Sequence, residues 1–152
     1  MSEITLDACK AMVGREIGVS RWFEIKQDRI NQFADVTEDH QFIHVDPERA
    51  KQTPFGGTVA HGFLTLSLLA PMAFDAQPTI SNTAMVVNYG FDRIRLIAPV
   101  PTGSRIRGHF VLKEVVDRGP HEIMARTEVT VEIEGGGKPA LVADWLGLTR
   151  FV

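Results

Sequence analysis

Residues 61–72 read His-Gly-Phe-Leu-Thr-Leu-Ser-Leu-Leu-Ala-Pro-Met, and this stretch decides the fold. After the glycine its only polar side chains are those of Thr65 and Ser67, so a helix formed here has no face suited to solvent. We therefore expect this helix to be buried on nearly all sides. Pro71 and Pro78 should limit its continuation, because proline lacks an amide hydrogen and crowds the preceding turn.

The second half of the chain predicts a sheet that can cover this helix. Apolar and polar residues alternate from His121 to Glu134 and from Arg105 to Val116, which is the period of a strand with one buried face. A turn-like sequence at 117–120 should join these two strands into a hairpin. Further strands are expected from Ala140 to Phe151, which is apolar on both faces like a central strand, from Thr83 to Leu96, and near Arg21 to Ile25.

The first half of the chain predicts two short helices. Asp28 is placed to cap a helix with one buried face made of Ile30, Phe33, Ala34 and Thr37. Asp46-Pro47-Glu48 is a helix-start signature, because aspartate can accept free amides and proline suits the first helical position. The segment 39–44 between them is expected to be a loop. Together these elements predict an α+β fold in which an antiparallel sheet of about five strands wraps around one central helix.

Composition limits the class of protein. A chain of 152 residues is about one domain, so residues 1–152 are treated as a single unit. It is 44% hydrophobic and 23% charged, and no segment approaches the roughly 20 apolar residues that span a bilayer. The net charge is -3 with basic residues scattered, which argues against a nucleic-acid partner. Small molecules or another protein chain are the expected partners.

Localisation and assembly can also be anticipated. Cys9 is the only cysteine, which excludes an intrachain disulfide and a thiolate metal cluster, and the N-terminal residues lack the pattern of a secretory signal. We expect a cytoplasmic protein. A small sheet with exposed edges is relieved by pairing two copies, so we also expect a homodimer.

Two neighbouring segments carry the residues suited to chemistry. Asp39 and His44 place a carboxylate and an imidazole five residues apart, and the glycine-rich stretch 55–63 leads into the apolar helix. A carboxylate and an imidazole can hold and deprotonate a water, while amides at a helix start can polarise a carbonyl. Asp39, His40 and His44 could also suggest a metal site, but no further ligand stands out at a suitable spacing, so no metal is expected.

Beyond these patterns, the chain resembles the MaoC-like hydratases of the hotdog fold, near their nodulation protein N-like branch. The resemblance covers nearly the whole chain. It is carried by five groups of residues: Arg29-Ile30-Asn31-Gln32-Phe33-Ala34, the segment Asp39 to His44, its continuation through Val45-Asp46-Pro47-Glu48-Arg49-Ala50, Ala60-His61-Gly62-Phe63, and Asn88-Tyr89-Gly90-Phe91-Asp92-Arg93-Ile94-Arg95.

The family's motif runs Gly-Asp-x-Asn-Pro-aliphatic-His, which implies that Asp39 and His44 are the catalytic residues. The chain departs from it at Glu38, where the family often has glycine, and at Gln41-Phe42, which replaces Asn-Pro. The implied reaction is reversible hydration of a trans-2-enoyl thioester of coenzyme A to the (R)-3-hydroxyacyl thioester, with no cofactor other than the coenzyme A of the substrate.

The resemblance also implies roles for residues around the pair. The backbone amide of Gly62 would stabilise charge on the thioester oxygen, and Gly57 would let the loop approach the substrate closely. The remaining expected substrate-binding residues are Gln41, His61, Arg93 and Arg95.

Ordinary structural roles compete with each of these assignments. Asp39 can cap a turn, His61 can cap the buried helix, and Gly62 can permit tight packing. Arginines alternating along a strand are usually solvated. A hotdog thioesterase and a non-catalytic acyl-thioester binding protein are the alternative functions.

Overall fold

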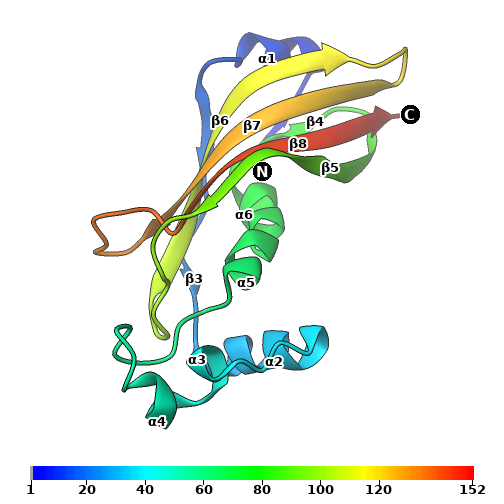
Figure 1. Cartoon of the computed structure of the whole chain (residues 1–152). Helices are drawn as coiled ribbons and strands as arrows, with labels where there is room; N and C mark the ends of the chain where they lie inside the picture. Colours follow the sequence, from blue (N-terminus) through cyan, green and yellow to red (C-terminus); the bar gives the residue numbers. More distant parts are fainter. Residues whose placement is uncertain (1) are drawn as a thin grey trace.

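The protein is described by a computed structural model covering residues 2–152, in which a long curved sheet lies over a helix (Figure 1). Its sheet has six strands, close to the five expected, and the main path runs β2-β6-β7-β8-β5 with every pair antiparallel. β3 also pairs with β6. The strands are β2 (Glu16–Val19), β3 (Phe23–Glu24), β5 (Thr83–Leu96), β6 (Arg105–Asp117), β7 (Glu122–Ile133) and β8 (Leu141–Phe151).

The strand predictions are confirmed in position and partner. β6 and β7 form the expected hairpin, with Ile106 opposite Ile133 and Asp117 opposite Ile123. β8 lies between β7 and β5, as its apolar character on both faces predicted. β2 was not anticipated; it is a short segment that lengthens the sheet beyond β6.

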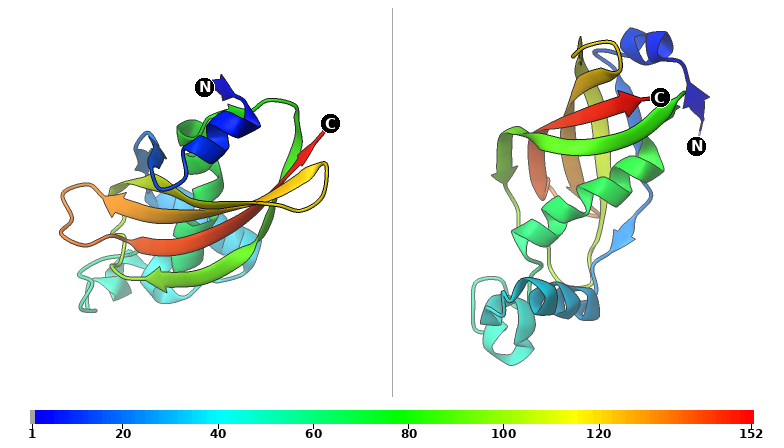
Figure 2. Two further views of the ribbon diagram at one scale, coloured as in Figure 1. Left: turned by 90° about the horizontal axis from the view of Figure 1, so that it is seen from above. Right: turned by 90° about the vertical axis from the view of Figure 1, so that its right-hand side faces the viewer.

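The apolar segment forms α5 (Gly62–Ser67) and α6 (Leu69–Ala76), which cross the concave side of the sheet (Figure 2). The helix is interrupted at Leu68, because Pro71 has no amide hydrogen to give the carbonyl four residues earlier. One face of the helix packs on the sheet, where Leu64, Leu69 and Met72 join the core.

The expectation that this helix is buried on nearly all sides is wrong for the single chain. Phe63 is 69% exposed and Phe74 is 65% exposed. Both lie on the side of the helix that the sheet leaves uncovered, because a single curved sheet can cover only one side of a cylinder.

Three helices form a separate layer at the N-terminal end of α5: α2 (Gln27–Thr37), α3 (Phe42–Val45) and α4 (Pro47–Ala50) (Figures 1 and 2). Asp28 lies in the first turn of α2 rather than capping it, since the N-cap is Lys26. Asp46 does cap α4, accepting a hydrogen bond from the Arg49 amide at 3.1 Å.

The remaining elements lie near the far end of α6. They are α1 (Leu6–Ala11) and the two-stranded parallel sheet of β1 (Glu3–Ile4) and β4 (Thr79–Ile80), none of which was predicted. Within residues 2–152 no helix combines the length and apolar character needed to cross a membrane.

Candidate active site

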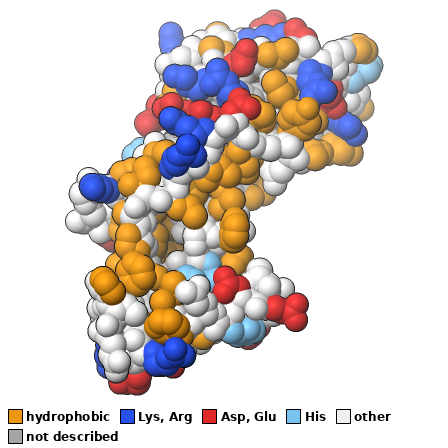
Figure 3. All heavy atoms as spheres, viewed as in Figure 1, with side chains coloured by type: hydrophobic (Ala, Val, Ile, Leu, Met, Phe, Trp, Pro, Cys, Tyr) orange, Lys and Arg blue, Asp and Glu red, His pale blue; other side chains and the backbone are white. Residues whose placement is uncertain are grey.

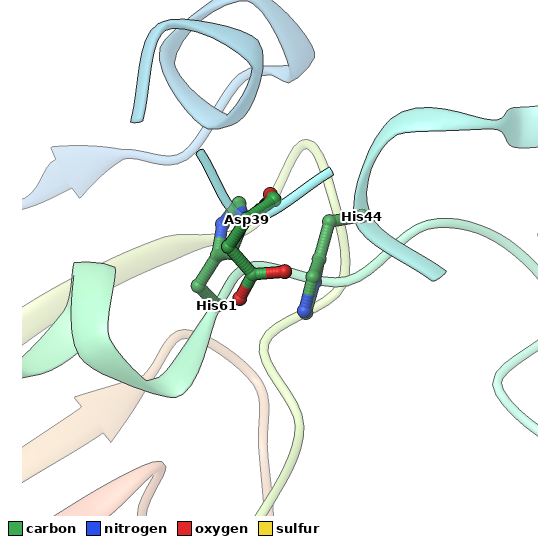
Figure 4. A group of neighbouring side chains, drawn as sticks. All are labelled: Asp39, His44 and His61. Atoms are coloured by element: carbon green, nitrogen blue, oxygen red, sulfur yellow. Dashed lines mark hydrogen bonds between the residues drawn. The ribbon is translucent and has the colours of Figure 1, made fainter. Parts of the chain in front are cut away.

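Three side chains from separate segments meet where the α2–α4 layer faces the start of α5 (Figure 4). Asp39 comes from the segment after α2, His44 from α3, and His61 directly precedes α5. One potential ligand or proton-accepting atom from each lies within 4.8 Å of the others. The site occupies the hollow seen between the two layers of the molecule (Figure 3).

Asp39 owes its position to a sharp turn at the end of α2. The C-cap residue Glu38 adopts the left-handed conformation with φ 62°, so the chain reverses direction before Asp39. The exposed Asp39 carboxylate then accepts a hydrogen bond from the Gln41 amide at 3.3 Å. This places a carboxylate oxygen beside the two imidazoles.

His44 lies on a single helical turn, so the prediction that it belongs to a loop is wrong. Its Nδ1 donates a hydrogen bond to the carbonyl oxygen of Val59 at 2.6 Å, since a carbonyl can only accept. That bond fixes the tautomer in which Nε2 carries the lone pair. Burial lowers the pKa of His44 below its ordinary 6.5; the Val59 bond opposes this, His61 lowers it further and Asp39 raises it. His44 is therefore an unprotonated base at neutral pH.

His61 is 2% exposed and packs between two rings. Its imidazole stacks on that of His44 with centroids 3.9 Å apart and planes 24° apart, and the Phe33 ring lies 4.9 Å away at a tilt. Its Nε2 donates to the main-chain oxygen of Asp39 at 3.0 Å. Within residues 2–152 its Nδ1 is buried without a hydrogen-bond partner.

Asp39, His44 and His61 together offer two histidines and a carboxylate as potential metal ligands. Their spacing in the sequence did not reveal this set. Catalytic zinc sites use such sets with an open position for water. The ring geometry disfavours a shared ion, because a lone pair lies in the plane of its ring and two stacked rings cannot both aim at one point without rotating. His40 points elsewhere and pairs with Asp35 at 2.9 Å.

Gly62 is the first residue of α5, and neither its amide nor that of Phe63 has a hydrogen-bond partner within residues 2–152. Free amides at a helix start favour negative charge. A Cβ at Gly62 would run into the side chain of Leu96 from β5, so tight packing also requires glycine here. The two interpretations of Gly62 are compatible.

The other predicted site residues are less closely assembled. Gln41 is the N-cap residue of α3 and reaches the cluster through its amide. Gly57 lies in the loop before α5, and a Cβ there would meet nothing within 4 Å. Arg93 and Arg95 lie on β5, where Arg93 pairs with Asp144 at 3.8 Å and Arg95 donates to the carbonyl of Ile94. Within residues 2–152 no hydrogen bond or ion pair ties either arginine to the cluster.

A supporting residue was missed entirely. Gln27, at the start of α2, donates from Nε2 to the main-chain oxygen of His44 at 2.7 Å and accepts at Oε1 from Thr58 at 2.6 Å. It thus ties α3 to the loop that leads into α5. Gln27 is far in sequence from His44 and Thr58, so no local sequence motif links it to either partner.

Comparison with known proteins identifies the family. Residues 9–133 match the family described as MaoC like domain. The chain belongs to the MaoC-like family. This MaoC-like chain is 52% identical to "Nodulation protein N" of Rhizobium meliloti, over 99% of this chain and 94% of the relative. It is 46% identical to "3-hydroxyacyl-thioester dehydratase Z" of Mycobacterium tuberculosis, over 93% and 92%.

Solved structures share the MaoC-like fold at low sequence identity. The monoamine oxidase regulatory protein from Archaeoglobus fulgius superposes with a TM-score of 0.80 at 23% identity, covering 100% of this chain and 97% of that one. An (R)-hydratase from A. caviae involved in PHA biosynthesis superposes with a TM-score of 0.73 at 20% identity, covering 89% and 94%. These matches confirm the hotdog fold.

Proposed function

We propose that the chain is a hydro-lyase that interconverts a trans-2-enoyl thioester of coenzyme A and the (R)-3-hydroxyacyl thioester. The observation that carries this proposal is the Asp39 carboxylate set beside the unprotonated imidazole of His44 at the start of α5. One of its relatives is named as a dehydratase and one protein of the same fold as a hydratase, and both names describe hydro-lyases. The coenzyme A of the substrate is the only cofactor that this chemistry needs.

The pair is spaced to hold one water. A carboxylate oxygen of Asp39 and a ring nitrogen of His44 lie within 4.8 Å of each other, and a water that hydrogen-bonds to two atoms at about 2.8 Å each can bridge such a gap. As the water oxygen bonds to C3 of the enoyl group, the pair accepts one of its protons and one proton is returned to C2. The amide of Gly62 stabilises the charge that develops on the thioester oxygen, which is what makes C3 electrophilic.

A groove along the helix supplies room for an acyl chain. α5 and α6 run antiparallel to β5: Gly62 faces Leu96, and Leu66 and Ala70 share a hollow with Phe91 and Asn88. Ala70, Asn88 and Trp145 also line a larger, mainly apolar cavity of about 420 Å³ at the α6 end. From Gly62 to Ala73 the helix advances about 16 Å at 1.5 Å per residue. We infer that the substrate carries a medium-length acyl chain along this path.

The working unit is proposed to be a homodimer. β5 is an edge strand of 14 residues, and its exposed apolar side chains include Met85, Val87 and Tyr89. Phe63 and Phe74 expose a further apolar surface on the helix. A second copy would cover these surfaces and pair the free edge.

The proposed function is tested by following the enoyl absorbance of crotonyl-CoA beside a free-thiol assay. We expect the absorbance to fall without thiol release, and chiral analysis of the product to give the (R)-hydroxy thioester. Thiol release would indicate a thioesterase, and substrate binding without turnover would indicate a binding protein; either result overturns the proposal.

A further inference from the structure

Among the residues of the site, His61 contacts both halves of the proposed machinery. We propose that His61 is a positioning residue that holds Asp39 and His44 in place relative to the start of α5, through one hydrogen bond and one ring stack. This inference deepens the proposed function by assigning a role to a side chain that the water-addition step itself does not use.

The hydrogen bond fixes the main chain of Asp39. Asp39 follows the left-handed residue Glu38 and lies outside any helix or strand. Within residues 2–152 the only hydrogen bond to its carbonyl oxygen comes from His61 Nε2 at 3.0 Å. His61 itself is the N-cap residue of α5, so this bond ties the segment carrying the carboxylate to the helix start carrying the free amide of Gly62.

The ring stack fixes the plane of His44. The centroid of the His61 imidazole lies 3.9 Å from that of His44 and 4.9 Å from that of the Phe33 ring. His44 is already held at Nδ1 by Val59, so the stack removes its remaining freedom to rotate about that bond. With the ring plane held, the direction of its Nε2 lone pair is fixed as well.

Burial is the main cause that lowers the pKa of His44, and His61 acts in the same direction. The titratable groups acting on the His44 ring are Asp39, which raises its pKa, and His61, which lowers it. Because His61 Nε2 donates to the main-chain oxygen of Asp39, the hydrogen of that ring lies on Nε2, and its buried Nδ1 is the unprotonated nitrogen of this tautomer.

Two substitutions separate the hydrogen bond from the ring. His61→Phe keeps a ring that can stack but has no donor, whereas His61→Gln keeps an N–H that can reach the Asp39 carbonyl but has no ring. We expect kcat for crotonyl-CoA hydration to fall about 100-fold in His61→Phe, because small misplacements of catalytic groups have effects of that size. We expect kcat of His61→Gln to be at least tenfold higher than that of His61→Phe. KM should stay within about threefold of wild type in both variants.

NMR titration of the imidazoles gives a readout that does not depend on turnover. We expect Nδ1–H for His44 and Nε2–H for His61, and an upward shift of the His44 titration midpoint in both His61 variants. His40→Gln and His40→Phe are matched controls, since His40 is exposed and paired with Asp35.

The outcomes are distinguishable. An unshifted His44 midpoint with wild-type kcat in folded His61 variants would overturn the positioning role. Equal losses of kcat in both variants, matched by equal drops in thermal midpoint, would reduce His61 to a packing residue and also overturn it. If wild type does not hydrate crotonyl-CoA but the tautomers and the midpoint shift are as expected, the positioning role stands and the proposed reaction fails.

Discussion

Filling the cavity at the α6 end should change which acyl chains the enzyme accepts. Gly147, on β8, lines this cavity opposite Ala125 of β7 and Asn88 of β5. A Cβ at Gly147 would have its nearest neighbour at 4.0 Å, and the residue does not need a positive φ. Gly147→Val therefore adds three carbons at the wall of the cavity, with room for the first of them, and valine suits a strand.

The size of the effect follows from the chain carbons displaced. At about 0.8 kcal/mol per buried methylene, losing room for three costs about 2.4 kcal/mol, or about 60-fold in kcat/KM. We expect this loss for a dodecenoyl thioester and a change of no more than about threefold for crotonyl-CoA, whose four carbons end near Gly62. Initial rates over a series of chain lengths measure the effect.

The matched control is Gly137→Val, because Gly137 lies in an exposed turn where a Cβ meets nothing within 4 Å. It should leave the chain-length profile unchanged. Equal losses for short and long substrates in Gly147→Val, or no loss for either, would refute the placement of the acyl chain in this cavity.

Three further predictions concern assembly, pH and the helix start. Val87→Lys on the β5 edge should convert a dimer to a monomer in sedimentation equilibrium, because it buries a charge in the pairing surface, whereas Val36→Lys, at a 79% exposed site on α2, should not. Because the pKa of His44 is lowered in the folded chain, the unfolded chain binds the proton more readily. The thermal midpoint of the wild-type protein should therefore fall as the pH drops below 6.5. The fall should be smaller in His44→Gln, which has no imidazole at this position. Gly62→Ala should lower kcat because its new methyl group displaces Leu96, and Leu96→Ala in the same chain should restore much of the loss; a loss untouched by Leu96→Ala would show that the clash is not the cause.

The strands could be predicted because each carries a local signal. β5 spans Thr83–Leu96 as expected, and β6, β7 and β8 differ from expectation only at their ends. Alternation of apolar and polar residues is a property of one segment of sequence. It can be recognised without knowing which elements pack on the strand. β2 carries no such signal: its four residues, Glu16–Val19, are too few to show a period.

The site was predictable only in part, for a physical reason. Asp39, His44 and Gly62 can be named from motifs within short segments, and the structure gathers their segments at the start of α5. The stack of His61 on His44 depends on tertiary contacts instead. The Ala60 amide bonds to the Val100 carbonyl at 2.9 Å, and Val59 pairs with Pro101, so a distant loop sets where His61 lies. No spacing in the sequence records that contact.

The central claim is that Asp39 and His44 act as one unit on one water. Single-turnover hydration of crotonyl-CoA by Asp39→Asn, His44→Ala and the double variant, each checked for folding, tests it most directly. Each single substitution should lower the rate by a factor of about 10² to 10⁴. The rate of the double variant should lie within about threefold of the rate of the slower single variant, because the effects of residues that act together are not additive. Losses that multiply in the double variant, or activity that survives either single substitution, would contradict the claim.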